Sequence, residues 1–187
     1  MGGGDTSLSV IIKIRAMEEK SKIVKTKVLT WKGKEYTATL TEEDVDKIKH
    51  KAIIAKLNGF GKDWFMDNVR SWVREEFPDE CSEIFDATEA KVEVGTPATE
   101  NLYIDHRAKT VVEVISPTKI VVAENETKCI DYYAGEYEVL DEIAEYMSKE
   151  TFTLRKGGTW VQEGQPKKSG SVTLTLGFRR HYIDPSF

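Results

Sequence analysis

The chain has 187 residues, of which 40% are hydrophobic and 10% aromatic, and its formal net charge is −5. This hydrophobic content is enough to bury the core of one domain or of two small ones, so the composition argues against disorder. No apolar run approaches the roughly 20 residues that cross a bilayer, and the first residues lack the basic, apolar and cleavage regions of a signal peptide, so we expect a soluble intracellular protein.

Charge is distributed unevenly along the chain. Residues 79–150 carry 18 acidic and 6 basic side chains, whereas residues 1–34 carry 8 basic and 3 acidic ones, and residues 151–187 carry 6 basic and 2 acidic ones. An acidic centre between basic ends predicts either a dipolar molecule whose faces meet differently charged partners, or segments that neutralise each other after folding. The sequence leaves both interpretations open.

The first half of the chain, residues 5–88, predicts a small α+β domain. Residues 22–40 alternate in the manner of two strands around a turn at Lys32-Gly33-Lys34. A helix then begins at Thr41, with Asp44 three residues later in a capping-box arrangement, and ends at Asn58-Gly59. Aromatic and apolar residues at helical spacing over residues 61–77 predict a second helix, which Pro78 ends.

The second half, residues 89–187, changes to an alternating period that predicts a β domain. We expect a strand at 90–95, a turn at Thr96-Pro97, a polar loop at 98–109 and a strand pair around Ser116-Pro117-Thr118. A hairpin over 151–163 and a last strand over 171–179 complete a set of five. Five short strands with a long loop after the first predict a small open barrel of SH3-like type.

The acidic segment 126–150 is predicted as an insertion between these strands. Val139, Ile143 and Met147 have the spacing of a short amphipathic helix, which would turn its acidic side chains outward. The candidate acidic binding residues are Glu136, Glu138, Asp141, Glu142 and Glu145. Rows of carboxylates on a rigid support imitate the charges of a phosphate backbone and can occupy the basic groove of a nuclease. An ordinary acidic surface is the alternative.

The basic C-terminal region supplies a second candidate binding surface. Its residues are Arg155, Lys156, Trp160, Lys167, Lys168, Arg179, Arg180 and Tyr182. Cations that neutralise phosphates release counterions, and aromatic rings stack on bases, so this combination suits a nucleic-acid groove if the residues share one barrel face. Alternatively, the cations form a solvated outer face and Trp160 closes the barrel core.

Residue types that usually carry catalysis or bind metals are scattered. Cys81 and Cys129 belong to no CxxC motif, and none of the three histidines has the spacing of a zinc site. The nearest arrangement to a catalytic cluster is Asp105-His106-Arg107, where an acid adjoins a base, but a polar loop explains these residues equally well. We therefore expect no enzymatic activity, no bound metal and no cofactor.

The pattern "VGTPAT…TVVEVISPTKIVV…FTLRKGGTWVQEGQ…GFRRHYIDPSF" resembles the C-terminal module of small uncharacterised proteins of bacteriophages and other mobile elements, over roughly residues 90–187. Such proteins with an added domain often antagonise host defence. The resemblance thus implies an anti-CRISPR inhibitor in the cytoplasm of the bacterial host. Its expected partner is the type II CRISPR effector nuclease, or that nuclease's guide RNA or DNA. The alternatives are a phage nucleic-acid-binding accessory protein, with weak nucleic-acid binding of its own, and a structural or assembly protein of the virion.

Overall fold

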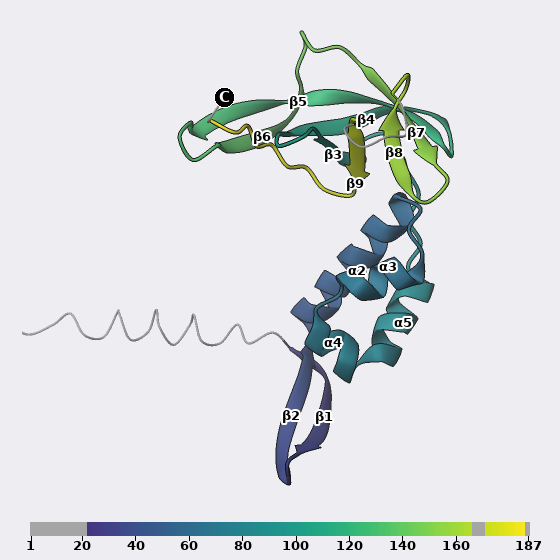
Figure 1. Ribbon diagram of the computed structural model, residues 1–187, viewed down its shortest axis with the longest axis vertical. Helices are drawn as coiled ribbons and strands as arrows, with labels where there is room; N and C mark the ends of the chain where they lie inside the picture. Colours follow the sequence, from purple (N-terminus) through teal and green to yellow (C-terminus); the bar gives the residue numbers. More distant parts are fainter. Residues whose placement is uncertain (1–21, 166–170, 186–187) are drawn as a thin grey trace, which may run out of the picture.

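A computed structural model describes residues 22–165 and 171–185. A strand pair, a group of short helices and a β-barrel follow one another along the chain and along the long axis of the molecule (Figure 1). The predicted α+β class, with an N-terminal hairpin, helices and a C-terminal barrel, is confirmed at this level.

The N-terminal hairpin consists of β1 (Ile23–Trp31) and β2 (Lys34–Thr41), which pair antiparallel. Lys32 and Gly33 form its two-residue turn with φ angles of 50° and 73°. Two positive φ angles are the signature of the type I′ turn, whose twist matches that of the flanking strands. The predicted hairpin is therefore confirmed.

Helix α2 (Glu42–Leu57) begins at the predicted capping box. The Thr41 hydroxyl accepts a bond from the Asp44 backbone N–H, and the Asp44 carboxylate accepts one from the Thr41 backbone N–H. These two bonds satisfy donors that a helix start otherwise leaves unpaired. Ile48 and Ala52 of this helix are buried in the core of the helical unit.

The rest of the helical unit differs from the prediction of one helix over 61–77. Two short helices cover these residues instead, α3 (Lys62–Asn68) and α4 (Ser71–Glu76), and a third helix, α5 (Pro78–Ala87), follows them. The backbone is extended at Val69, where α3 ends, and Pro78 begins α5 in the first helical turn, where its missing N–H costs nothing. These breaks fold the chain back on α2, so that Phe65, Val73 and Phe77 all reach one core.

Seven strands follow the helices within the described residues. They are β3 (Pro97–Asn101), β4 (His106–Ser116), β5 (Lys119–Asp131), β6 (Glu136–Ile143), β7 (Glu150–Arg155), β8 (Thr159–Gln162) and β9 (Thr173–Leu176). Neighbours pair antiparallel in the order β4-β3-β9-β8-β7-β5-β6, and β4 also pairs with β5. That pairing closes six strands into a barrel and leaves β6 outside, on the edge of β5.

Three predictions about the start of the barrel are wrong. Residues 90–95 form no strand, and Thr96-Pro97 is not a turn between strands, because Pro97 is the first residue of β3. The expected loop at 98–109 contains most of β3 and the start of β4. The error has a physical cause: both faces of β3 are buried, so its polar side chains face partners inside the protein instead of solvent. The Thr99 hydroxyl donates to the Phe178 carbonyl, and the Glu100 carboxylate forms an ion pair with Lys109.

The predicted helical insertion at 126–150 is also wrong. Strand β5 continues to Asp131, and β6 returns along it with Lys128 opposite Glu138 and Cys129 opposite Tyr137. Helical spacing of apolar residues is outweighed here by the strand-favouring tyrosines and β-branched residues of the segment. Its acidic residues therefore lie on a two-stranded ribbon and on the loop that follows β6.

One buried asparagine joins the helical unit to the barrel. Asn58, at the end of α2, donates from Nδ2 to the carbonyls of Ile54 (2.7 Å) and Leu176 (3.0 Å), and its Oδ1 accepts from the Leu176 N–H (2.9 Å). The Trp160 indole donates to the carbonyl of Leu57 (3.1 Å). The side chain of Asn58 thus continues the hydrogen-bond ladder of β9, and these bonds fix α2 against the barrel.

Candidate functional site

The interior of the barrel is divided into an apolar half and a charged half. The apolar half, beside α2, is built from Leu57, Ala98, Val111, Ile120, Val122, Phe152, Trp160, Leu174 and Leu176. Trp160 is only 1% exposed, so it fills this core and has no face open to a base. The alternative interpretation of Trp160, as the residue that closes the core, is therefore the one that the structure supports.

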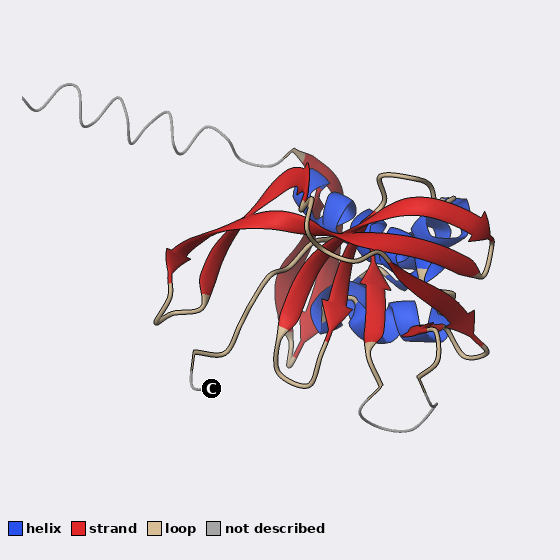
Figure 2. Cartoon of the chain, turned by 90° about the horizontal axis from the view of Figure 1, so that it is seen from above, coloured by secondary structure: helices blue, strands red, loops and turns tan. Residues whose placement is uncertain are grey.

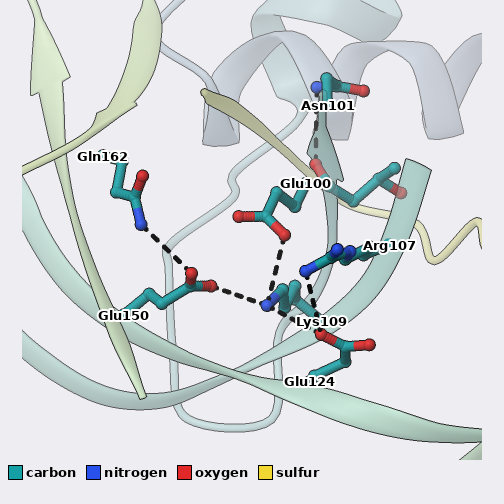
Figure 3. Close-up of polar contacts among 8 residues, drawn as sticks. Glu100, Asn101, Arg107, Lys109, Glu124, Glu150 and Gln162 are labelled. Atoms are coloured by element: carbon teal, nitrogen blue, oxygen red, sulfur yellow. Dashed lines mark hydrogen bonds and ion pairs between the residues drawn. The ribbon is translucent and has the colours of Figure 1, made fainter. Parts of the chain in front are cut away.

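The charged half surrounds one buried lysine (Figure 3). Lys109 Nζ lies 2.6 Å from Glu150 Oε2, 3.2 Å from Glu124 Oε2 and 3.3 Å from Glu100 Oε2. The side chains of Lys109 and Glu100 are both 2% exposed. Arg107 lies at the edge of the cluster, 4.0 Å from Glu124 Oε2. The four members in direct contact come from β3, β4, β5 and β7, so the cluster connects four of the six barrel strands.

The electrostatics of this cluster keep the lysine charged. Burial lowers the pKa of Lys109, but the hydrogen bond that Lys109 donates to Glu150 and the negative charges of Glu100 and Glu150 more than offset it, so the pKa is raised overall. Burial raises the pKa of Glu100, and the attraction of Lys109 offsets only part of that effect. A lysine that stays protonated is no nucleophile. The cluster is therefore suited to holding strands together.

None of these four residues is among the predicted binding residues, although the sequence contains a signal for the cluster. Glu100, Lys109 and Glu124 each stand two residues from an apolar barrel residue, namely Ala98, Val111 and Val122. Residues two apart share one face of a strand. Charged residues of both signs in line with apolar stripes on successive strands therefore indicate an internal ion cluster.

The β5–β6 ribbon continues outward past the wall of the barrel, with the C-terminal segment beside it (Figure 2). The predicted acidic residues Glu136, Glu138, Asp141, Glu142 and Glu145 are all exposed. Glu136 and Glu138 share one face of β6, opposite the face of Tyr137, because side chains alternate along a strand. Tyr132 and Tyr133 lie at the exposed tip of the ribbon. The ribbon therefore presents carboxylates and aromatic rings together.

The C-terminal segment anchors the other face of the ribbon. The rings of Tyr137 and His181 meet edge to face at 4.8 Å. Gly135, at the ribbon tip, lies so close to Tyr182 that an added Cβ would come within 2.7 Å of its ring. Arg179 donates to Asp141 Oδ1 at 2.6 Å. The ribbon thus rests on a fixed support, while its acidic side chains and its tip are exposed.

The structure does not bring the predicted basic residues onto one face. Arg155 lies on β7, and Lys156 is in the turn that follows. The segment with Arg179 and Arg180 is instead held against β4 and β3, because Arg179 Nε donates to Thr110 and the Arg180 N–H donates to Thr99 Oγ1. Strands β3 and β7 are three places apart in the barrel order. Tyr182 lies near Arg180, at 5.8 Å from its ring centroid to the guanidinium carbon, and Lys167 and Lys168 are outside the described residues.

The cluster Asp105-His106-Arg107 has structural contacts. The backbone of His106 pairs with that of Tyr182 through two bonds of 2.8 Å, and Asp105 Oδ1 accepts from the Asp184 N–H at 3.0 Å. Burial and the positive charge of Arg180 lower the pKa of His106. Asp105 and His106 thus hold the C-terminal segment on the barrel, whereas Arg107 lies beside Glu124.

Comparison with known protein families, with curated proteins and with solved structures found no match. Within residues 22–165 and 171–185, no group of three or more His, Cys, Asp or Glu side chains is arranged to hold a metal ion. None of the described helices is both long enough and apolar enough to cross a membrane.

Proposed function

We propose that this chain is a binding protein that inhibits the type II CRISPR effector nuclease. In this proposal the β5–β6 ribbon contacts a basic surface on which the nuclease normally holds its guide RNA or its DNA. One observation supports it above the others: an acidic ribbon with exposed tyrosines projects from the barrel on a support that the protein itself fixes.

Strand geometry suits this role. Residues on one face of a strand recur at about 6.7 Å, which is twice the roughly 3.4 Å axial spacing of phosphates along one DNA strand. Glu136 and Glu138 are related in this way. A partner groove that neutralises phosphates with Lys and Arg would meet carboxylates in a similar arrangement, and Tyr132 and Tyr133 would add apolar contact area, as tyrosine does in many interfaces.

Rigidity supports the same role. An acidic loop without structure would lose conformational entropy on binding, which weakens association. The contacts of the ribbon with His181, Tyr182 and Arg179 remove much of that entropy before the partner arrives. We place this activity in the cytoplasm of the bacterial host, and we assign the closed barrel to the SH3-like type because hairpins form most of its wall.

Direct binding tests the proposal. We would measure the affinity of the full chain for a guide-loaded type II nuclease by biolayer interferometry at 50 and 300 mM salt. The expected result is specific binding that weakens with salt, together with loss of binding for the triple variant Glu136→Lys, Glu138→Lys and Glu142→Lys. A control with the same change of charge on the helical unit, Glu75→Lys, Glu83→Lys and Glu89→Lys, should bind normally.

Other outcomes decide against the proposal. Salt-sensitive binding to free DNA or RNA without binding to the nuclease would favour the nucleic-acid accessory protein. Concentration-dependent self-association without either interaction would favour a structural protein of the virion. Equal loss of binding in both triple variants would show that net charge matters and that the ribbon does not.

A further inference from the structure

A groove lies where the helical unit, the connecting segment and the barrel meet. It has a volume of about 410 Å³. Its lining comes from the end of α2, the connection to the barrel, the β4–β5 turn and β7, and comprises Lys56, Leu57, Ala90, Lys91, Val92, Val114, Ser116, Pro117 and Leu154. Small-molecule sites typically have volumes of about 300–1,000 Å³ and often lie between structural units. The ribbon described above is not part of this groove.

The lining combines an apolar floor with unneutralised positive charge. Leu57 belongs to the barrel core, and Leu154 and Val92 pack against it. Lys56 and Lys91 are the charged lining residues, and the lining contains no carboxylate. Lys56 Nζ lies 4.2 Å from the centre of the Phe85 ring. Among the described residues, neither lysine has a carboxylate within ion-pair distance.

A third polar group completes the rim. The Ser116 hydroxyl oxygen accepts a bond from the Thr118 N–H at 3.3 Å and lies 3.5 Å from the Thr118 hydroxyl oxygen, where either hydroxyl can donate. When the Thr118 hydroxyl donates to Ser116, the hydrogen of the Ser116 hydroxyl is available to a ligand. Two ammonium groups and one hydroxyl beside an apolar floor are complementary to a ligand with one anionic oxygen-bearing end and one aliphatic end. Such a ligand would replace the missing carboxylate partner of the lysines and would cover the exposed part of Val114.

We propose that this groove binds an amphipathic monocarboxylate of the medium-chain fatty-acid class. The aliphatic chain lies on Leu57, Val92 and Leu154, and the carboxylate contacts Lys56 and Lys91. Burying each methylene of such a chain contributes about 0.8 kcal/mol, while the ion pair supplies the preference for an acid over an alcohol. Because the ligand touches α2, the connection and the barrel at once, its binding also strengthens the joint between them.

Isothermal titration calorimetry with decanoate, kept below its micellar concentration, tests this proposal on the full chain. We expect saturable binding of one decanoate per chain, and binding of 1-decanol at least tenfold weaker. Lys56→Gln with Lys91→Gln should weaken decanoate at least tenfold. The matched control, Lys47→Gln with Lys51→Gln, removes the same charge from another face of α2 and should leave decanoate binding unchanged.

A second variant separates ligand binding from folding. Val114→Trp fills the groove from its partly exposed rim and should abolish decanoate binding while far-UV circular dichroism stays that of the parent. The proposal is overturned if decanoate binds at several equivalent sites, if the lysine variant binds it as well as the parent, or if a folded Val114→Trp variant still binds it.

Discussion

Replacing the buried lysine by methionine should destabilise the barrel strongly. Lys109→Met keeps the length of the side chain but removes the ammonium group that lies within 3.3 Å of three carboxylates. Removing one partner of a buried ion pair costs about 3–5 kcal/mol, because the remaining charge is left uncompensated. We expect a loss in this range, which is a large part of the roughly 5–15 kcal/mol that stabilises a typical domain.

Urea unfolding at pH 7.5, followed by circular dichroism and tryptophan fluorescence, measures this loss. The double variant Lys109→Met with Glu100→Gln should recover part of it, since one of the uncompensated charges is gone. The deficit of the single variant should also shrink toward pH 5, because protonation of Glu100 then relieves the repulsion. A loss below about 1 kcal/mol, or no recovery in the double variant, would refute the view that Lys109 holds these carboxylates together.

Three further predictions concern the cluster and the joint. The pKa of Glu100 is raised in the native state, so the native state binds more protons than the unfolded state. The contribution of Glu100 to stability is therefore fully present below pH 4.5 and is lost as the pH rises through the pKa of the native state. Glu100→Gln should flatten the dependence of the free energy of unfolding on pH, measured by urea unfolding at several pH values, and an unchanged dependence would assign it to another group. Asn58→Ala removes three hydrogen bonds and leaves backbone groups of Leu176 unpaired. We expect it to lower the free energy of unfolding, measured by thermal or urea unfolding, by about 2–4 kcal/mol. A change near zero would mean that water replaces the hydrogen bonds of the asparagine. At Gly158 (φ 84°) an added Cβ would come within 2.6 Å of the Phe60 ring, whereas at Gly164 (φ 85°) it would meet nothing within 4 Å. Gly158→Ala should therefore lower the melting temperature more than Gly164→Ala. Equal decreases of the melting temperature would show that only the strain of the positive φ angle matters.

Local signals in the sequence predicted the elements that they control directly. The turn at Lys32-Gly33, the capping box at Thr41 and the hairpin over 151–163 all appear in the structure. Each depends on the conformation of a few neighbouring residues, so no tertiary information is needed. The break of the aromatic helix at Val69 depends instead on packing against α2, which a window of sequence does not contain.

The larger errors come from positions where tertiary contacts outweigh local polarity. The charges of Glu100 and Lys109 led to the prediction of a polar loop over residues 98–109, but in the structure these two residues form an ion pair with each other inside the barrel. The apolar residues of the acidic segment recur every four positions and therefore predict a helix. In the structure the segment instead pairs antiparallel with β5 as a strand. Likewise, the sequence places Arg179 near other cations, but only the fold shows that it is paired with Asp141.

Cleavage of a labelled target duplex by a guide-loaded type II nuclease tests the central claim most directly. The full chain would be added before or after the DNA, beside the ribbon variant (Glu136→Lys, Glu138→Lys, Glu142→Lys) and its charge-matched control (Glu75→Lys, Glu83→Lys, Glu89→Lys). We expect the parent and the control to prevent cleavage when they are added before the DNA, and we expect the ribbon variant not to prevent it. Undiminished cleavage with the parent across several type II nucleases, or equal inhibition by the ribbon variant, would contradict the central claim.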